Sequence, residues 1–153
     1  MAVRDTHQRI QDVRRMLETE VDAWVASTDD SGEPYLIPLS FAWTGSQLIM
    51  AAPASSRTVR NLHRGGQTRV GIGPTRDVVM IDATVSIESP APSDPRWDVH
   101  AEQAGFDARR SDPAYALIVL NPVRIQAWRN PAELAGRTVY QNGAWLEDAG
   151  QSV

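Results

Sequence analysis

Apolar and polar residues alternate along several stretches of the chain, which is the pattern of strands buried on one face. The clearest stretch runs over residues 35–43 and ends at a Thr-Gly-Ser turn. Its large apolar residues share one face: Tyr35, Ile37, Leu39, Phe41 and Trp43. Pro38 lies among the smaller residues of the other face. Because proline donates no ladder hydrogen bond, Pro38 predicts an edge position or a bulge.

The same pattern predicts further strands on both sides of this stretch. They are expected over residues 24–28, 47–53, 68–73, 77–88 and 115–129, with a last short strand or hairpin over 138–146 around Asn142-Gly143. The strand over 115–129 is expected to be interrupted at Asn121-Pro122. Gly71 and Gly73 predict a bend or a close approach by another group.

Helical periodicity predicts three helices, over residues 7–19, 56–64 and 96–109. The helix over 56–64 is expected to stop at Gly65-Gly66. Most connections between strands are as short as hairpin loops, so the sheet is expected to be antiparallel. The predicted fold class is therefore mainly β: a six- to seven-stranded antiparallel barrel with flanking helices.

Length and composition limit the classes of function that this chain can have. The 153 residues fit one domain, with a helix over 1–19, the barrel over 20–146 and a tail over 147–153. The net charge of −4 argues against nucleic-acid binding, and the lack of cysteine excludes disulfides and thiolate chemistry. The N-terminus lacks a signal-peptide pattern, and no apolar run approaches the roughly 20 residues that span a bilayer. We therefore expect a cytoplasmic protein without a membrane partner.

One short stretch carries candidate binding chemistry. Ser55-Ser56-Arg57-Thr58 opens the helix over 56–64, between two predicted strands. A helix start offers unpaired N–H groups and a partial positive charge, which suit a phosphate or a carboxylate. The hydroxyls and the Arg57 guanidinium would complete such a cradle. The same letters also fit an ordinary N-cap, followed by a solvated stripe of Arg57, Arg60 and Arg64.

Motifs for catalysis without a cofactor are missing. The three histidines, His7, His63 and His100, have no second histidine or carboxylate at metal-ligand spacing, so no metal site is predicted. Asp82 and Glu88 fall on the outer face of their strand, where carboxylates are usually solvated, and no catalytic residue is assigned. An enzyme built on this chain would need a cofactor to carry the chemistry.

Four segments taken together resemble a known superfamily. They are Gly32-Glu33-Pro34-Tyr35-Leu36-Ile37-Pro38-Leu39, Leu48-Ile49-Met50-Ala51-Ala52, Ser56-Arg57-Thr58-Val59-Arg60-Asn61-Leu62 and Arg69-Val70-Gly71-Ile72. Their order and spacing are similar to the pyridoxamine 5′-phosphate oxidase-like superfamily of FMN-binding split β-barrels, over roughly residues 20–146. The resemblance implies a flavin or deazaflavin cofactor bound by a homodimer.

The resemblance also implies positions for the cofactor. Residues 37–41 would lie along the ring, Met50, Ala51 and Ala52 beside it, and Arg57 and Thr58 at the phosphate. Trp128 and Arg137 would close the site from the partner subunit. The full set of candidate cofactor-binding residues is Ile37, Pro38, Leu39, Ser40, Phe41, Met50, Ala51, Ala52, Ser55, Ser56, Arg57, Thr58, Arg60, Asn61, Asp77, Trp128 and Arg137.

The substrate half of the oxidase pattern is not retained. Its substrate-binding Arg, His and Lys correspond here to Glu133, Ala135 and Ala42, and a glutamate would repel the phosphate of a vitamin B6 substrate. We therefore expect a reductase other than a pyridoxamine phosphate oxidase, which passes hydride to a small organic substrate. Lysine-poor relatives resemble the branch that uses coenzyme F-420, so F-420 is favoured, with FMN as the alternative. A non-catalytic carrier of flavin, deazaflavin or a tetrapyrrole is the competing interpretation.

Overall fold

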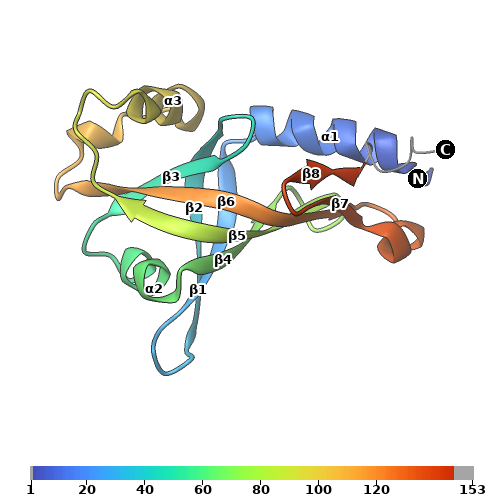
Figure 1. The fold of residues 1–153 in the computed structure, drawn as a ribbon, viewed down its shortest axis with the longest axis horizontal. Coiled ribbons are helices and arrows are strands. Elements are labelled where there is room, and N and C mark those ends of the chain that lie inside the picture. The colour runs from blue at the N-terminus through green and yellow to red at the C-terminus, as the bar shows by residue number, and fades with distance from the viewer. Residues whose placement is uncertain (1, 147–153) are drawn as a thin grey trace.

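The computed structural model describes residues 2–146 and confirms the predicted β-barrel (Figure 1). The strands are β1 (Asp22–Thr28), β2 (Pro34–Trp43), β3 (Leu48–Pro53), β4 (Gln67–Ile72), β5 (Val78–Glu88), β6 (Tyr115–Trp128), β7 (Thr138–Gln141) and β8 (Ala144–Trp145). The helices are α1 (Thr6–Thr19), α2 (Arg57–Gly65) and α3 (Pro95–Ala104), with 3-10 turns η1 (Ala108–Arg110) and η2 (Pro131–Gly136).

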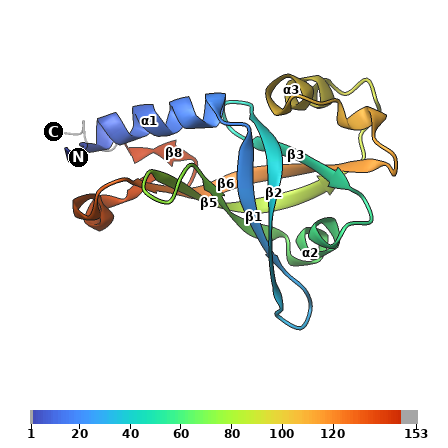
Figure 2. The same cartoon turned by 180° about the vertical axis from the view of Figure 1, so that it is seen from behind.

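Closure of the sheet makes the barrel. The strand order is β3-β2-β1-β4-β5-β6-β7-β8, all neighbours are antiparallel, and β3 also pairs with β6. The closed ring thus consists of β3, β2, β1, β4, β5 and β6. β7 pairs with β6 and β8 pairs with β7, so these two strands continue the sheet outside the ring. In Figures 1 and 2 the β1–β2 hairpin projects from one end of the barrel, while α1 crosses the other end.

Inward-facing side chains fill the barrel because alternation sends every second residue to one face. The core includes Val25 of β1, Phe41 of β2, Val70 of β4, Ile81 of β5 and Ile125 of β6, all fully buried. Ile10, Val13 and Leu17 of α1 and Val59 and Leu62 of α2 join the same core. A second cluster joins Trp97 of α3 and Ala108 of η1 to outward residues of β3 and β6. Helix α3 therefore covers the outside of β3 and β6.

The barrel is split between β2 and β3. β2 pairs with β1 from Pro34 to Ser40, whereas it pairs with β3 only from Phe41 to Trp43. The first part of β2 is thus an edge, which confirms the edge position predicted from Pro38. Within residues 2–146, the first part of β2 therefore has no neighbouring strand on the β3 side of the barrel wall.

Two local predictions are wrong. The helix expected over 96–109 ends at Ala104, because Gly105 takes a left-handed conformation (φ +85°) and η1 follows as a separate turn. β6 is not interrupted at Asn121-Pro122: it continues through the proline, and the register shifts by one residue opposite Asp82 and Ala83. A β-bulge accommodates the missing N–H without ending the strand.

The remaining turn signals are confirmed. Asn142 and Gly143 both have positive φ (53° and 85°) in the β7–β8 hairpin, as a two-residue primed turn requires. Gly66 ends α2 with φ +70°. Gly73 meets a close approach, since a Cβ built there would lie 2.5 Å from the Asp77 carbonyl oxygen.

A buried ion pair ties the N-terminal segment to η2. The side chain of Glu133 has no exposed surface, and its carboxylate accepts from the Arg4 guanidinium (2.9 and 3.2 Å) and from the backbone N–H groups of Arg4 and Arg129. Asp12 on α1 contacts the guanidinium groups of both Arg4 and Arg129. Burial alone would raise the pKa of Glu133, but these hydrogen bonds and the Arg4 charge outweigh it and lower the pKa to about 2.

Candidate functional site

A hollow of about 280 Å³ lies at the split between β2 and β3. It is lined by Asp22, Pro38, Leu39, Ser40, Ala51, Ala52, Pro53, Phe106 and Tyr115, and we call it the split pocket. Five of these residues belong to the predicted ring-binding set: Pro38, Leu39, Ser40, Ala51 and Ala52. The structure therefore brings together the two strand segments that the sequence nominated separately.

Three members of the predicted ring-binding set do not line this pocket. Phe41 and Met50 are fully buried in the barrel core, and Ile37 is half-buried on the inner face of β2. Only the backbone of β2 and β3 at Phe41 and Met50 could face a ligand, since their side chains point into the barrel.

The start of α2 follows the split pocket directly. Ser56 is the N-cap of α2, and its hydroxyl accepts from the Val59 N–H (3.2 Å), while its own N–H donates to the Pro53 carbonyl (2.9 Å). Ser56 is therefore an N-cap, which confirms one of the two interpretations of this segment. The backbone N–H groups of Arg57 and Thr58 have no acceptor within residues 2–146, as expected for the first turn of a helix. Ser55 is exposed beside them.

The three arginines of α2 differ in their partners. Arg60 donates to the Ser55 carbonyl (2.5 Å), and Arg64 donates to the Thr28 carbonyl (2.6 Å). Arg57 makes no hydrogen bond or ion pair within the described part of the chain. Its guanidinium carbon lies 5.0 Å from the centre of the Tyr35 ring. Stacking on Tyr35 orients the Arg57 guanidinium and leaves its N–H donors open to an anion.

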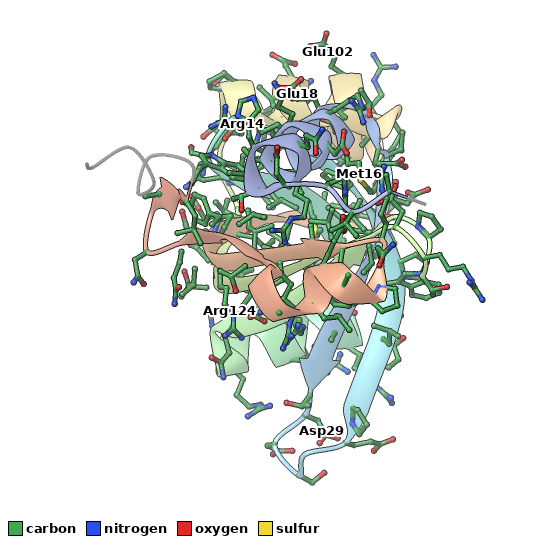
Figure 3. The ribbon with its side chains drawn as sticks, turned by 90° about the vertical axis from the view of Figure 1, so that its right-hand side faces the viewer. Arg14, Met16, Glu18, Asp29, Glu102 and Arg124 are labelled. Atoms are coloured by element: carbon green, nitrogen blue, oxygen red, sulfur yellow. The ribbon has the colours of Figure 1, made fainter. Side chains whose placement is uncertain are left out.

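These arginines line a second hollow of about 350 Å³, which we call the arginine hollow. Its lining residues are Asp29, Asp30, Arg57, Arg60, Asn61 and Arg64. Asp29 lies at the tip of the β1–β2 hairpin (Figure 3), and its carboxylate accepts from Ser31 and from the Glu33 N–H. Arginine outnumbers aspartate in this lining, so the hollow has a net positive charge.

Two predicted residues of α2 are buried. Thr58 is 1% exposed, and its hydroxyl has no hydrogen-bond partner within the described residues. Asn61 is also buried, and its amide donates to the Ser27 hydroxyl (3.1 Å). The Thr58 side chain is therefore not positioned to meet a ligand in the arginine hollow, although its backbone N–H is open.

Asp77, Trp128 and Arg137 lie elsewhere in the fold. Asp77 accepts from the Arg129 guanidinium (3.1 Å), Trp128 ends β6 opposite Val78, and Arg137 donates to the Leu134 carbonyl (2.9 Å). None of the three lines the split pocket or the arginine hollow. Within one chain, the structure does not bring them to the other candidate residues.

Glu133 does not have the repelling role that the sequence suggested. Its carboxylate is buried against Arg4 and so faces no ligand that it could repel. Asp82 also differs from the expected solvated carboxylate: it accepts from Arg124 (2.8 Å) and lies 3.7 Å from Arg69 (Figure 3 labels Arg124).

The outer face of the barrel carries exposed apolar residues. Trp24 is 53% exposed, Leu36 58% and Val123 44%. Leu36 and Val123 line an open hollow of about 920 Å³, together with residues of β1, β2, β4, β5, β6 and β7 that include Arg69 and Arg124. We call this surface the outer apolar face. The pairing register puts Asp22, Pro38 and Ser40 on the same side as Trp24 and Leu36, so the split pocket adjoins this face.

Four lining residues of the split pocket were missed from the sequence: Asp22, Tyr115, Phe106 and Pro53. Asp22 lies opposite Ser40 in the β1–β2 register, Tyr115 lies opposite Pro53 in the β3–β6 register, and Phe106 follows Gly105. The first two positions depend on strand pairing, which the sequence left open. Within residues 2–146, no group of three or more potential metal ligands lies together, and no helix is long and apolar enough to cross a membrane.

Comparison with known proteins identifies the family and the fold. The sequence model of the pyridoxamine 5′-phosphate oxidase family matches residues 10–129. The chain therefore belongs to this family of flavin-binding split barrels. Among curated proteins, none matches this chain significantly.

Solved structures show the same fold at low sequence identity. An F420 reductase superposes with a TM-score of 0.62 at 16% identity, over 73% of this chain and 94% of its own. An FAD-binding protein from Mesorhizobium loti gives 0.63 at 13% identity, over 76% and 89%. A heme binding protein from Mycobacterium smegmatis gives 0.69 at 12% identity, over 94% of this chain and 60% of that protein.

Proposed function

We propose that this protein is a cytoplasmic, homodimeric reductase that uses reduced deazaflavin F-420, with FMN as the alternative cofactor. When bound, such a cofactor supplies a hydride for a small organic substrate. The chain contributes binding, orientation and exclusion of water. At 16% identity, the match to the F420 reductase supports a shared fold alone. The choice of cofactor therefore depends on the residues of the site.

The main support for this proposal is the environment of the Arg57 guanidinium. Its guanidinium is oriented by Tyr35 and has no hydrogen-bond partner in the described chain, beside two open N–H groups at the start of α2. This donor set matches a phosphate, which accepts several charge-assisted hydrogen bonds at once. The Ser56–Pro53 hydrogen bond holds the start of α2 against one wall of the split pocket. A planar ring in that pocket and a phosphate at Arg57 would then belong to one ligand.

The arginine hollow favours F-420 over FMN. FMN ends at its phosphate, whereas F-420 continues into an anionic oligoglutamate tail. Beyond Arg57, the hollow presents Arg60 and Arg64, whose charges would attract such a tail. Asp29 and Asp30 oppose this attraction on the hairpin side and would direct the tail along α2.

A second copy of the chain would complete the site. Trp128 and Arg137 lie away from Arg57 in one chain, and the split pocket adjoins the outer apolar face, where Trp24 and Leu36 are more than half exposed. Pairing of two such faces would bury this apolar surface and cover the split pocket. We propose that the partner then supplies Trp128 and Arg137.

The dimer makes a testable prediction. Wild-type protein is expected to have a solution mass of about twice 16.8 kDa by light scattering coupled to size exclusion. Leu36→Glu places a charge on the outer apolar face and is expected to shift the mass towards the monomer, whereas Val99→Glu, at an apolar residue of α3 that is 38% exposed, leaves it unchanged. A monomeric wild type would contradict the proposal.

The cofactor is tested by titration of the purified protein with F-420 and with FMN, read by tryptophan quenching. Micromolar or tighter binding of F-420, with weaker binding of FMN, is expected. A screen of enones, quinones and nitro compounds with reduced F-420 as donor then tests for turnover. Tight binding without turnover would favour a carrier, and binding of neither cofactor would overturn the proposal. A tetrapyrrole carrier, for which the heme binding neighbour is the precedent, is tested by haem in the same assay.

A further inference from the structure

The split pocket holds few polar side chains, and they form an unusual set. Among its lining residues, only Asp22, Ser40 and Tyr115 carry polar side-chain atoms. The Ser40 hydroxyl donates to Oδ1 of Asp22 at 2.7 Å. Oδ2 of Asp22 has no partner among the described residues, and neither has the Tyr115 hydroxyl. The pocket therefore presents one free carboxylate oxygen and one free phenol.

The framework holds these groups at fixed positions. Asp22 and Ser40 are direct partners in the β1–β2 register, and Tyr115 is the direct partner of Pro53 in the β3–β6 register. Both registers belong to the closed barrel, where a slip would turn core residues outward. The spacing of the two polar groups across the pocket is thus set by strand pairing and not by a loop.

Aromatic rings form the wall on the α3 side. Phe106 contacts Tyr115 edge to face, with ring centres 6.3 Å apart, and contacts His100 in the same way at 5.3 Å. His100 is fully buried, and burial lowers its pKa, so its ring is a neutral support behind Phe106. Phe106 itself is 39% exposed. The pocket thus combines apolar walls with one strong acceptor and one donor.

This combination fits the edge of a particular kind of ring. An imide edge carries an N–H between two carbonyl groups, as in the pyrimidinedione of flavins and deazaflavins. A carboxylate accepts from that N–H, and a phenol donates to an adjacent carbonyl. A hollow of about 280 Å³ is near the lower limit of about 300 Å³ for ligand pockets, which suits a ring system and not a whole cofactor. Asp22 would repel a ring that carries carboxylates, such as a tetrapyrrole with propionates.

We propose that Asp22 recognises the imide N–H of the bound ring and that Phe106 and Tyr115 form the aromatic wall of its pocket. The inference rests on the proposed function, because it takes the split pocket as the ring site. It adds a specificity-determining residue: Asp22 selects rings with an N–H donor at this edge and disfavours rings with an acceptor or a carboxylate there.

A pair of ring probes tests this role without any turnover. Lumiflavin is the flavin ring without a phosphate, and 3-methyllumiflavin has a methyl group in place of the imide hydrogen. Binding is read from the fluorescence of each probe. Wild-type protein is expected to bind lumiflavin about tenfold more tightly than the methylated probe, since a charge-assisted hydrogen bond is lost. In Asp22→Ala the ratio is expected to fall to about one, because lumiflavin binding weakens and binding of the methylated probe does not.

Matched variants separate this role from general damage. Asp98→Ala removes an exposed carboxylate of α3 outside the pocket and is expected to keep the tenfold ratio. Phe106→Ala is expected to weaken both probes by the same factor and also keep the ratio. Asp22→Asn keeps an acceptor oxygen without the charge and is expected to give an intermediate ratio.

The outcomes distinguish this inference from the proposed function. A wild-type ratio of one, a tenfold ratio that persists in Asp22→Ala, or no binding of lumiflavin by the wild type overturns the role of Asp22. If F-420 or FMN nevertheless binds through Arg57, the proposed function stands. If the ratio depends on Asp22 but F-420 and FMN bind no more tightly than lumiflavin, the role of Asp22 stands and the phosphate site at Arg57 fails.

Discussion

Replacing Glu133 by alanine is expected to lower the free energy of unfolding by about 3–5 kcal/mol. The Glu133 carboxylate is buried and accepts four hydrogen bonds, from the guanidinium and backbone of Arg4 and from the backbone of Arg129. Its removal leaves the Arg4 side chain, 8% exposed, with Asp12 as its remaining counter-charge, and leaves two backbone N–H groups without an acceptor. The cost of unpaired buried groups therefore adds to the loss of the ion pair.

Urea unfolding followed by tryptophan fluorescence measures this change, with Asp98→Ala as the control. Asp98 also pairs with an arginine, Arg109, but its side chain is 72% exposed. An exposed pair contributes at most about 1 kcal/mol, so the control is expected to unfold close to the wild type. Equal midpoints for the two variants would show that the Glu133 pair does not hold the N-terminal segment.

The same carboxylate predicts how stability depends on pH. Its pKa falls from an ordinary value of 4.5 to about 2 on folding, so the folded state favours the ionised form. The stabilisation is fully present above pH 4.5 and is lost as the pH falls from 4.5 towards 2. Unfolding measured between pH 7 and pH 3 is expected to show a smaller loss in Glu133→Gln than in the wild type. Asp12, whose pKa is also lowered, adds to the loss in both proteins.

Replacing Arg57 by alanine is expected to weaken binding of F-420 and FMN about 10- to 100-fold. A hydrogen bond to a charged group contributes about 1.5–3 kcal/mol, and about 1.4 kcal/mol corresponds to a factor of ten. The Arg57 side chain is exposed and donates no hydrogen bond within the described chain. Its removal is therefore expected to leave the fold intact. The effect should therefore appear in affinity and not in stability.

Three further variants sharpen the Arg57 measurement. Arg15→Ala removes an exposed arginine of α1 and is expected to leave both affinities unchanged. Arg57→Lys keeps the charge but not the planar donor fork, and is expected to fall between wild type and Arg57→Ala. Arg64→Ala is expected to weaken F-420 and leave FMN unchanged, because only F-420 has a tail to reach it. Unchanged affinity for both cofactors in Arg57→Ala would remove the phosphate site.

The local parts of the fold and site were predictable. Alternation located the strands around Phe41 and Ile81, the pair Asn142-Gly143 located the last hairpin, and the serine before Arg57 located the N-cap of α2. Each of these signals lies within a few residues of the structure it specifies. The two local errors lie at Gly105, which ends a helix that was predicted to continue, and at Asn121-Pro122, where a strand continues that was predicted to be interrupted. At each position the local sequence is compatible with both backbone conformations, and the surrounding packing selects one.

The composition of the site was predictable only in part. The two segments that the resemblance assigns to the ring, around Pro38 and Ala51, line one pocket at the split, and Arg57 is exposed with open donors. Asp22, Phe106 and Tyr115 carry no local mark of a binding role. The burial of Thr58 and the pairing of Glu133 with Arg4 also have no counterpart in sequence spacing, since each depends on packing against distant elements.

The sequence by itself determined the strands and helices, the antiparallel barrel and the N-cap that begins α2, because alternation, capping and turn residues act over short spans of chain. The tertiary structure alone decided which of these parts meet. Closure of the barrel by β3 and β6 brings Tyr115 beside Pro53, the β1–β2 register brings Asp22 beside Ser40, and the path of β6 carries Trp128 away from Arg57. Such contacts depend on strand pairing and packing between distant segments, which no local pattern encodes.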